Sequence, residues 1–254
     1  MTSPSMVWLD AQPSLYCFNH KLAVLLSRTR AVRRWSFQHD PDESCSMETI
    51  HDFLVQSLED FQEPPHLIAH GLSGTIACLF AHRYSRLVRS LTVLSVDTLS
   101  CNHWHNHYLA MRSKLPCSRS QILSQLSLNI LGKKNTQINS FLSESLECCL
   151  DFDYTTGSIV GQEVIKHLTP PDVPMLILNG KNDFVVDSGS LERWKCILKS
   201  GDCIDLIPQG RHFFHYSKAA EVAQKINAFI EMTGIGQFPD FISSNTLMQT
   251  NSKS

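Results

Sequence analysis

The chain has 254 residues, of which 43% are hydrophobic and 18% are charged, so its length and composition suit one globular α/β domain. Its 22 Lys and Arg against 24 Asp and Glu give a formal net charge of −2, which gives no reason to expect a nucleic acid or an anionic membrane as partner. No apolar run approaches the roughly 18 residues of a membrane-spanning helix, and the first residues lack the pattern of a secretory signal. The nine cysteines include no Cys-x-x-Cys pair, which favours reduced thiols in a cytoplasmic protein. We expect no cofactor and no metal.

Apolar strand patterns alternate with helical patterns along the first hundred residues. Ser46 is a favourable N-cap for a helix at 47–61, in which apolar residues recur every three or four positions. The alternation predicts a mostly parallel sheet with helices on both faces. We expect strands at 6–11, 32–37, 64–70 and 87–96, and helices at 20–29, 47–61 and 74–84.

The alternation stops at about residue 99 and returns after residue 172. Helical patterns fill the interval, and strands and helices then alternate again. The helical patterns lie at 118–132, 135–150 and 155–168, the later strands at 175–180 and 203–208, and the later helices at 190–200 and 217–232. We therefore expect one doubly wound α/β domain over 1–233 with a helical lid inserted at 99–172, and a disordered polar tail at 234–254.

The segment AHGLSG, at 69–74, has the pattern of a sharp turn between a strand and a helix. It resembles the Gly-x-Ser-x-Gly-Gly turn with which the α/β-hydrolase fold presents its nucleophilic serine. Ala81 and Tyr84 in the following helix support this alignment, and Gly71 then stands where the family has the serine. The resemblance implies an α/β-hydrolase-like sheet with a lid over a pocket.

Two later segments extend the resemblance. VPMLILNGKNDFVV is similar to the family's strand and acid loop and places Asp183 at the catalytic acid. IPQGRHFFHYS is similar to the loop of the catalytic histidine and places His212 there, in the family's chain order. The first 65 residues match loosely, because DAQP at 10–13 replaces the His-Gly turn that lends an oxyanion-hole N–H, and the family's first two strands have no counterpart.

The resemblance implies a pocket at the end of the first strand, around the turn and at the start of the lid. Its expected lining is Ala11, Gln12, His70, Leu72 and Trp104. His70 is expected to pack rather than to catalyse, and His215 and Tyr216 to be structural.

Glycine at the nucleophile position argues against ordinary serine hydrolysis. The turn forces a backbone conformation that costs a non-glycine residue about 1–3 kcal/mol, and Gly71 adopts it without that strain. It also removes the hydroxyl, and loss of a triad serine typically lowers kcat on the order of 10⁶-fold. Ser73 follows about 200° around the helix and about 3 Å along it, so it should point away from His212. We expect it to satisfy a free backbone N–H, with a shifted nucleophile at Ser73 as the alternative.

Asp183 and His212 allow two interpretations. The carboxylate could fix the imidazole tautomer and leave His212 as a general base. Some relatives with the α/β-hydrolase fold perform cofactor-free oxygenation or lyase reactions with such a dyad. Alternatively, the two residues form a buried hydrogen-bonded pair that only holds two loops together.

Three histidines stand at alternate positions in CNHWHNHY, at 101–108: His103, His105 and His107. On a strand they would share one face and could bind Zn or Cu. Because this segment begins the insertion, we favour the first turn of a lid helix, in which the imidazoles splay apart. Trp104, Tyr108 or a histidine would then line the mouth of the pocket. The following sequence, 104–123, is similar to the lids of uncharacterised cyanobacterial hydrolase-like proteins.

The leading hypothesis is an α/β-hydrolase-like protein that binds a small apolar or ester-like molecule for sensing or scaffolding, without serine hydrolysis. The alternatives are an enzyme in which the His212–Asp183 dyad acts as the general base, and a hydrolase that uses Ser73. A second copy or another protein is a possible partner, since the missing first strands would leave a sheet edge exposed.

Overall fold

The computed structural model describes residues 5–38, 40, 45–100, 102–132, 135–154 and 167–235. Six strands form one parallel sheet in the order β2-β1-β3-β4-β5-β6, which is the predicted fold class. The strands are β1 Met6–Asp10, β2 Val32–Ser36, β3 His66–His70, β4 Ser90–Leu94, β5 Met175–Gly180 and β6 Cys203–Ile207.

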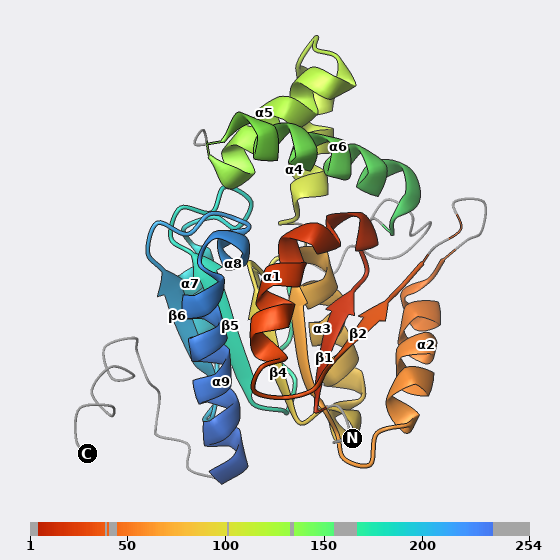
Figure 1. Cartoon of the computed structure of the whole chain (residues 1–254), viewed down its shortest axis with the longest axis vertical. Helices are drawn as coiled ribbons and strands as arrows, with labels where there is room; N and C mark the ends of the chain where they lie inside the picture. Colours follow the sequence, from red (N-terminus) through yellow and green to blue (C-terminus); the bar gives the residue numbers. More distant parts are fainter. Residues whose placement is uncertain are drawn as a thin grey trace.

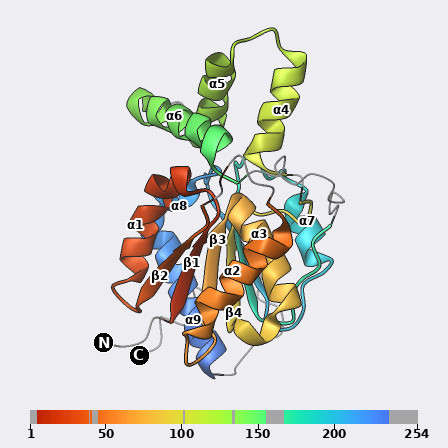
Figure 2. The ribbon, with the colours of Figure 1, turned by 90° about the vertical axis from the view of Figure 1, so that its right-hand side faces the viewer.

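Helices cover both faces of the sheet, with α1 and α9 on one face and α2, α3 and α7 on the other (Figures 1 and 2). Three further helices between β4 and β5, namely α4, α5 and α6, stand over the end of the sheet toward which the strands point. The helices are α1 Tyr16–Leu26, α2 Met47–Glu59, α3 Gly71–Arg83, α4 Trp104–Lys114, α5 Arg119–Leu131, α6 Thr136–Phe152, α7 Ser190–Lys195, α8 Phe214–Ser217 and α9 Ala219–Ile235, with 3-10 turns η1 Pro13–Leu15 and η2 Ser85–Leu87.

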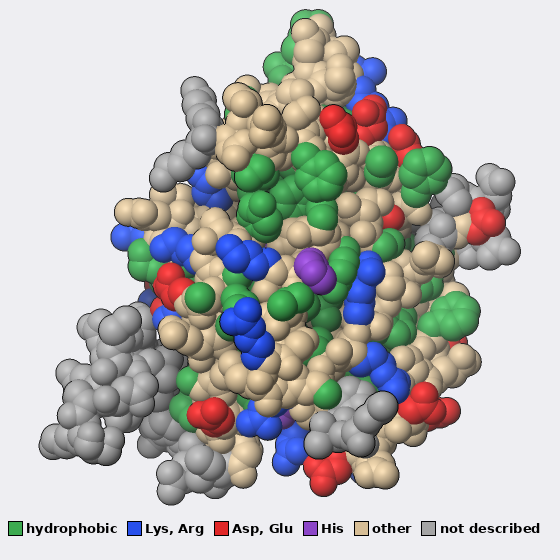
Figure 3. All heavy atoms as spheres, viewed as in Figure 1, with side chains coloured by type: hydrophobic (Ala, Val, Ile, Leu, Met, Phe, Trp, Pro, Cys, Tyr) green, Lys and Arg blue, Asp and Glu red, His purple; other side chains and the backbone are tan. Residues whose placement is uncertain are grey.

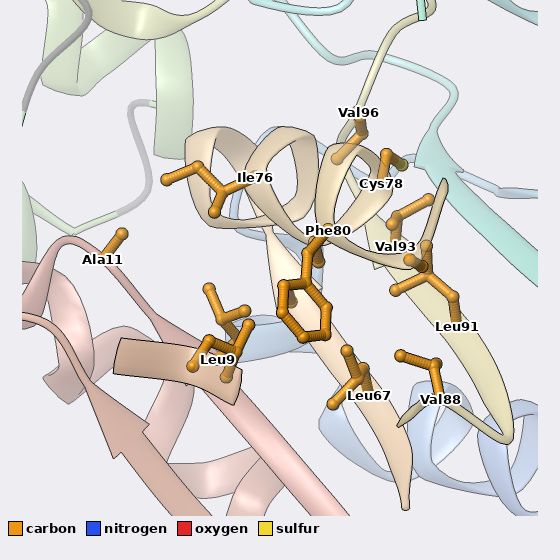
Figure 4. Packing of buried hydrophobic residues seen from close by; sticks show 14 of the residues in the cluster. Leu9, Ala11, Leu67, Ile76, Cys78, Phe80, Val88, Leu91, Val93 and Val96 are labelled. Carbon is orange, nitrogen blue, oxygen red and sulfur yellow. The ribbon is translucent and has the colours of Figure 1, made fainter. Parts of the chain in front are cut away.

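The strands read as continuous apolar runs because both faces of the sheet are buried. In β1, Val7 and Leu9 point into the core beneath α2 and α3, whereas Met6 and Trp8 point into the core beneath α1 and α9. Figure 4 shows the first of these cores, where Phe80 of α3 lies over the sheet. A third cluster joins the three inserted helices to α1 and to the loops below them, through residues that include Phe18 of α1 and Phe213.

Several element ends differ from the sequence prediction. The helix expected at 190–200 ends at Lys195, because the N–H of Lys199 bonds to the Asp202 carboxylate in a turn that leads to β6. The strand expected from residue 87 begins at Ser90 after a 3-10 turn, and α1 and α3 begin earlier than expected, at Tyr16 and Gly71. The helix expected at 155–168 lies almost entirely outside the described residues, as does most of the tail.

No helix in the described ranges is long and apolar enough to cross a bilayer. Every cysteine within those ranges has a free thiol.

Ser46 caps α2 as predicted, because its Oγ accepts the backbone N–H of Thr49 at 3.1 Å. We expect Ser46→Ala to lower the free energy of unfolding by about 1 kcal/mol, since that N–H loses its partner. Ser57→Ala, in the interior of the same helix, is the matched control and should cost nothing, because alanine favours helix interiors. Urea denaturation measures both, and equal losses in the two variants would contradict the capping role.

Candidate functional site

Gly71 forms the turn between β3 and α3 in the conformation that the resemblance implies. Its φ is +53°, the left-handed region in which an L side chain is strained and glycine is not. A Cβ built on Gly71 would meet one heavy atom within 4 Å, the Nε2 of His212 at 3.7 Å. The turn therefore keeps space for a side chain in front of His212.

Asp183 and His212 lie side by side in the loops that follow β5 and β6. The two carboxylate oxygens of Asp183 are 3.2 and 3.1 Å from Nδ1 of His212, and the side chains are 0% and 1% exposed. Burial raises the pKa of Asp183, but the charge of His212 and hydrogen bonds that include the N–H of Val185 outweigh it and lower the pKa below its usual value. In the neutral form of the His212 ring, the Asp183 carboxylate accepts the Nδ1–H, and Nε2 is then the hydrogen-bond acceptor.

Nε2 of His212 has no hydrogen-bond partner among the described residues, although it is buried. Buried polar atoms normally have a partner, so an orphaned acceptor at this place requires an explanation. It faces the space that the missing side chain of Gly71 leaves. A hydrogen-bond donor in that space would satisfy it.

The backbone of His212 is held by two side chains, one at the end of β3 and one directly after β4. Its carbonyl accepts the hydroxyl of Ser95 at 2.8 Å and the Nε2–H of His70 at 3.0 Å. Burial first, and then the charge of His215 and His212, lowers the pKa of His70 well below its usual value, so that its ring is neutral. His70 thus packs against His212 and holds its carbonyl. The role of Ser95 was not predicted from the sequence. Its unusual feature is a positive φ of 53° after β4, and no local sequence pattern predicts that conformation.

The Ser73 hydroxyl does not make the contact with His212 that a nucleophile would make. Its Oγ accepts the backbone N–H of Ala11 at 2.9 Å. It makes no hydrogen bond to His212, whose Nε2 lacks a partner in the described part of the chain. The expectation that Ser73 satisfies a free N–H therefore agrees with the geometry, and that N–H belongs to the turn after β1.

Among the other residues predicted to line the pocket, Gln12 and Trp104 connect the turn after β1 to the inserted helix α4. The indole N–H of Trp104 in α4 donates to the side-chain oxygen of Gln12 at 3.4 Å, and the Gln12 amide donates to the carbonyl of Tyr154 at 3.5 Å. Leu72 is buried in the core beneath α2 and α3. Trp104 and Gln12 are thus brought together where α4 meets the turn after β1, while Leu72 packs in the core.

The three histidines of 101–108 make separate contacts. His103 precedes α4 and hydrogen-bonds Thr75 at 3.4 Å, with a pKa lowered to about 3 by burial and then by the charge of His212. His107 contacts the carbonyl of Val185 at 3.2 Å, while His105 lies beside Trp104. Across the described residues, no group of three His, Cys, Asp or Glu side chains could hold a metal ion. The three imidazoles therefore point to different neighbours, with His103 before α4 and His105 and His107 within it.

Apolar side chains gather on the surface between α1 and the inserted helices (Figure 3). A groove of about 240 Å³ opens there, lined by Cys17, Phe18, Gln137, Ile138, Phe141 and Tyr216. The ring of Phe18 contacts that of Phe213 with centroids 5.1 Å apart, and Phe213 in turn lies 5.4 Å from the ring of His212. The rings of Phe18 and Phe213 thus separate this groove from the Asp183–His212 pair.

No family model matches the chain. Among solved structures, the meta-cleavage product hydrolase CumD of Pseudomonas fluorescens is similar with a TM-score of 0.64 and 13% identity, covering 89% of each chain. Naproxen esterase of Bacillus subtilis has a TM-score of 0.62 and 15% identity, covering 90% of this chain and 84% of the esterase. The uncharacterized protein alr2406 of Nostoc sp. (strain PCC 7120) is 31% identical over 231 residues, which are 89% of this chain and 90% of that protein. The chain therefore belongs to the same family as this Nostoc protein, and its fold is that of the α/β hydrolases.

Proposed function

We propose that the chain is a binding protein built on the α/β-hydrolase fold, which holds a small molecule beside Gly71 and does not hydrolyse esters by a serine mechanism. One observation carries the proposal: the buried Nε2 of His212 has no partner in the described structure and faces the space at Gly71. An unsatisfied buried acceptor costs about 1–3 kcal/mol, which a ligand O–H or N–H recovers on binding.

The hydroxyls in the described part of the site support the absence of serine chemistry. Position 71 has no side chain, and the Ser73 hydroxyl is bound to Ala11 rather than to His212. A serine nucleophile needs a hydrogen bond to its general base, and neither position supplies one. The apolar surroundings favour a ligand with an aromatic or aliphatic body, because Phe213 packs directly against His212.

Binding is tested with pairs of aromatic or aliphatic alcohols and their methyl ethers, which differ in the hydrogen that the ligand donates. We expect the alcohols to bind wild-type protein about 5- to 10-fold more tightly than the ethers, since one hydrogen bond is worth about 1 kcal/mol. Isothermal titration calorimetry measures the ratio. His212→Ala should abolish the preference, whereas His82→Ala, which replaces an exposed histidine of α3, should retain it. An equal preference in the His212 variant would contradict the proposal.

A second function is favoured by the bond between Asp183 and His212, because it leaves Nε2 free to accept a proton from water or from a substrate. In this case the ligand is turned over rather than only held. Turnover of an ester or hydroxyketone panel that is lost in His212→Ala and kept in Ser73→Ala would support the base mechanism. A fluorophosphonate adduct on Ser73 of the wild-type protein would instead make the chain a serine hydrolase with a shifted nucleophile.

A further inference from the structure

We propose that Ser95 is a positioning residue: its hydroxyl fixes the carbonyl of His212 and thereby directs Nε2 of that ring toward the space beside Gly71. The consequence for ligands rests on the proposed function, because Nε2 is the atom that accepts the hydrogen of the ligand. The positioning itself does not depend on a ligand and is tested without one.

The backbone at Ser95 has the same left-handed conformation as the backbone at Gly71. Both residues have a φ of +53°. Both directly follow neighbouring strands at the same level, because His70 at the end of β3 is the register partner of Leu94 at the end of β4. Glycine adopts this conformation without strain at position 71, whereas at position 95 a serine bears the strain. Serine therefore costs stability at this position unless its side chain compensates for it.

The bend at Ser95 is imposed by its contacts with β5. The backbone N–H of Ser95 donates to the carbonyl of Leu178 at 2.9 Å. The side chain of Asn179 binds both backbone groups of Val96, since its Oδ1 accepts the N–H at 3.1 Å and its Nδ2 donates to the carbonyl at 3.2 Å. Strained backbone persists where the surrounding contacts over-determine it. Replacing the side chain at position 95 should therefore remove its contacts without releasing the bend.

The Ser95 hydroxyl provides the compensation through both members of the Asp183–His212 pair. Ser95 is buried, and its Oγ donates to the carbonyl of His212 at 2.8 Å. Burial raises the pKa of Asp183, but the charge of His212 and several hydrogen bonds, one of them with the Ser95 side chain, lower it below its usual value. One hydroxyl thus connects the loop that follows β5 to the loop that follows β6.

Replacing Ser95 should disturb the alignment of the His212 ring and not the fold of its loop. His70 donates to the same carbonyl at 3.0 Å, so one of the two donors remains. Hydrogen bonds weaken steeply as their angle departs from linearity. A small displacement of the His212 backbone therefore weakens the bond from its Nδ1–H to the Asp183 carboxylate, whose oxygens lie at 3.1 and 3.2 Å.

The test compares Ser95→Gly with Ser95→Ala in the full chain. Both variants lack the hydroxyl, but only glycine also removes the backbone strain, so Ser95→Gly should be the more stable of the two in urea denaturation. We expect the Nδ1–H proton of His212 to exchange with solvent about 5-fold faster than in the wild type in both variants, because one hydrogen bond changes an equilibrium by about that factor. Proton NMR measures this exchange, and the nitrogen shifts of the ring report its tautomer.

Two further variants control the measurement. His212→Ala assigns the signal of the ring. Ser90→Ala is the matched control, since Ser90 is a buried hydroxyl at the other end of β4 that contacts His66 instead of His212. We expect the exchange and the tautomer of His212 to be unchanged in Ser90→Ala.

The comparison of exchange with stability decides the inference. Faster exchange or a mixed tautomer in both Ser95 variants, with no change in Ser90→Ala, supports the positioning role. A purely structural role predicts that the ring follows stability, with Ser95→Gly close to the wild type, and that result overturns the inference, as does a ring that is unchanged in both variants. The preference for alcohols over methyl ethers should also fall in both variants. If the wild type lacks that preference, the proposed function alone fails, because the NMR measurement needs no ligand.

Discussion

Gly71→Ser is expected to make the protein react covalently with a fluorophosphonate probe at the introduced hydroxyl. The Cβ of such a residue lies 3.7 Å from Nε2 of His212, which leaves its hydroxyl within hydrogen-bond reach of an imidazole that Asp183 already orients. A triad serine is worth on the order of 10⁶ in rate, so we expect labelling at least about 10³-fold faster than in the wild type. Labelling kinetics with mass spectrometry of the adduct measure the effect.

The control for this variant is Gly71→Ala, which adds the Cβ without the hydroxyl. Both substitutions place a side chain at a φ of +53°, so both should lose about 1–3 kcal/mol of stability through backbone strain. Gly71→Ala should remain unlabelled, and Gly71→Ser/His212→Ala should lose the reactivity. Labelling that persists without His212 would show that the dyad does not activate the hydroxyl, and the base interpretation of His212 would then fail as well.

The strands of the sheet could be predicted from the sequence because they are buried on both faces and therefore form apolar runs between turn residues. The ends of the helices and strands were harder to predict from the sequence. α7 stops at Lys195 because the carboxylate of Asp202 takes the N–H of Lys199, a contact that forms only once the turn leading to β6 exists. The start of α3 at Gly71 follows from the turn itself, since the helix begins directly after the strand.

In the candidate site, too, features within local segments could be predicted from the sequence, whereas contacts between distant residues could not. The pairing of Asp183 with His212 followed from two local segments that resemble a known family, and the side chains meet as that resemblance implies. The partner of Ser73 is 62 positions away and depends on the β1–β3 register, which no local segment encodes. Ser95 likewise reaches His212 across 117 positions. What sequence reasoning could not supply is long-range pairing, and at this site such pairing decides which polar groups remain free.

The histidines buried in the fold make the protein sensitive to acid. Burial is the largest cause in every case, and it lowers the pKa of His51 and His66 to about 4 and that of His103 and His215 to about 3, with His70 well below its usual value. An unfolded histidine titrates near 6.5, so below that pH the unfolded chain binds protons that the folded chain refuses. The stability that these groups contribute is complete above pH 6.5 and is lost as the pH falls toward 4.

The expected loss is comparable with the whole stability of a domain. At 1.36 kcal/mol per pKa unit, each of the four groups with a pKa of about 4 or 3 removes about 2 kcal/mol between pH 6.5 and pH 5, so that together they reach the lower part of the typical total of about 5–15 kcal/mol. Burial also raises the pKa of Asp10 and of Asp153, which works in the opposite direction but involves fewer groups. We therefore expect the free energy of unfolding to fall steeply as the pH is lowered from 6.5 to 5, as measured by urea denaturation over a series of pH values.

His51→Phe separates this effect from general acid damage. His51 packs between the rings of Phe80 and Tyr84, and neither of its nitrogens has a partner among the described residues, so phenylalanine can replace its ring. Besides burial, the charge of Arg83 lowers its pKa and that of Glu48 opposes the shift. The variant should reduce the stability difference between pH 7 and pH 4 by up to about 3 kcal/mol, whereas His82→Phe should leave that difference unchanged because His82 is exposed. If the free energy of unfolding stays constant from pH 7 to pH 4.5, these imidazoles are protonated in the folded protein. The prediction would then be wrong, and so would the neutral state given to the His70 ring.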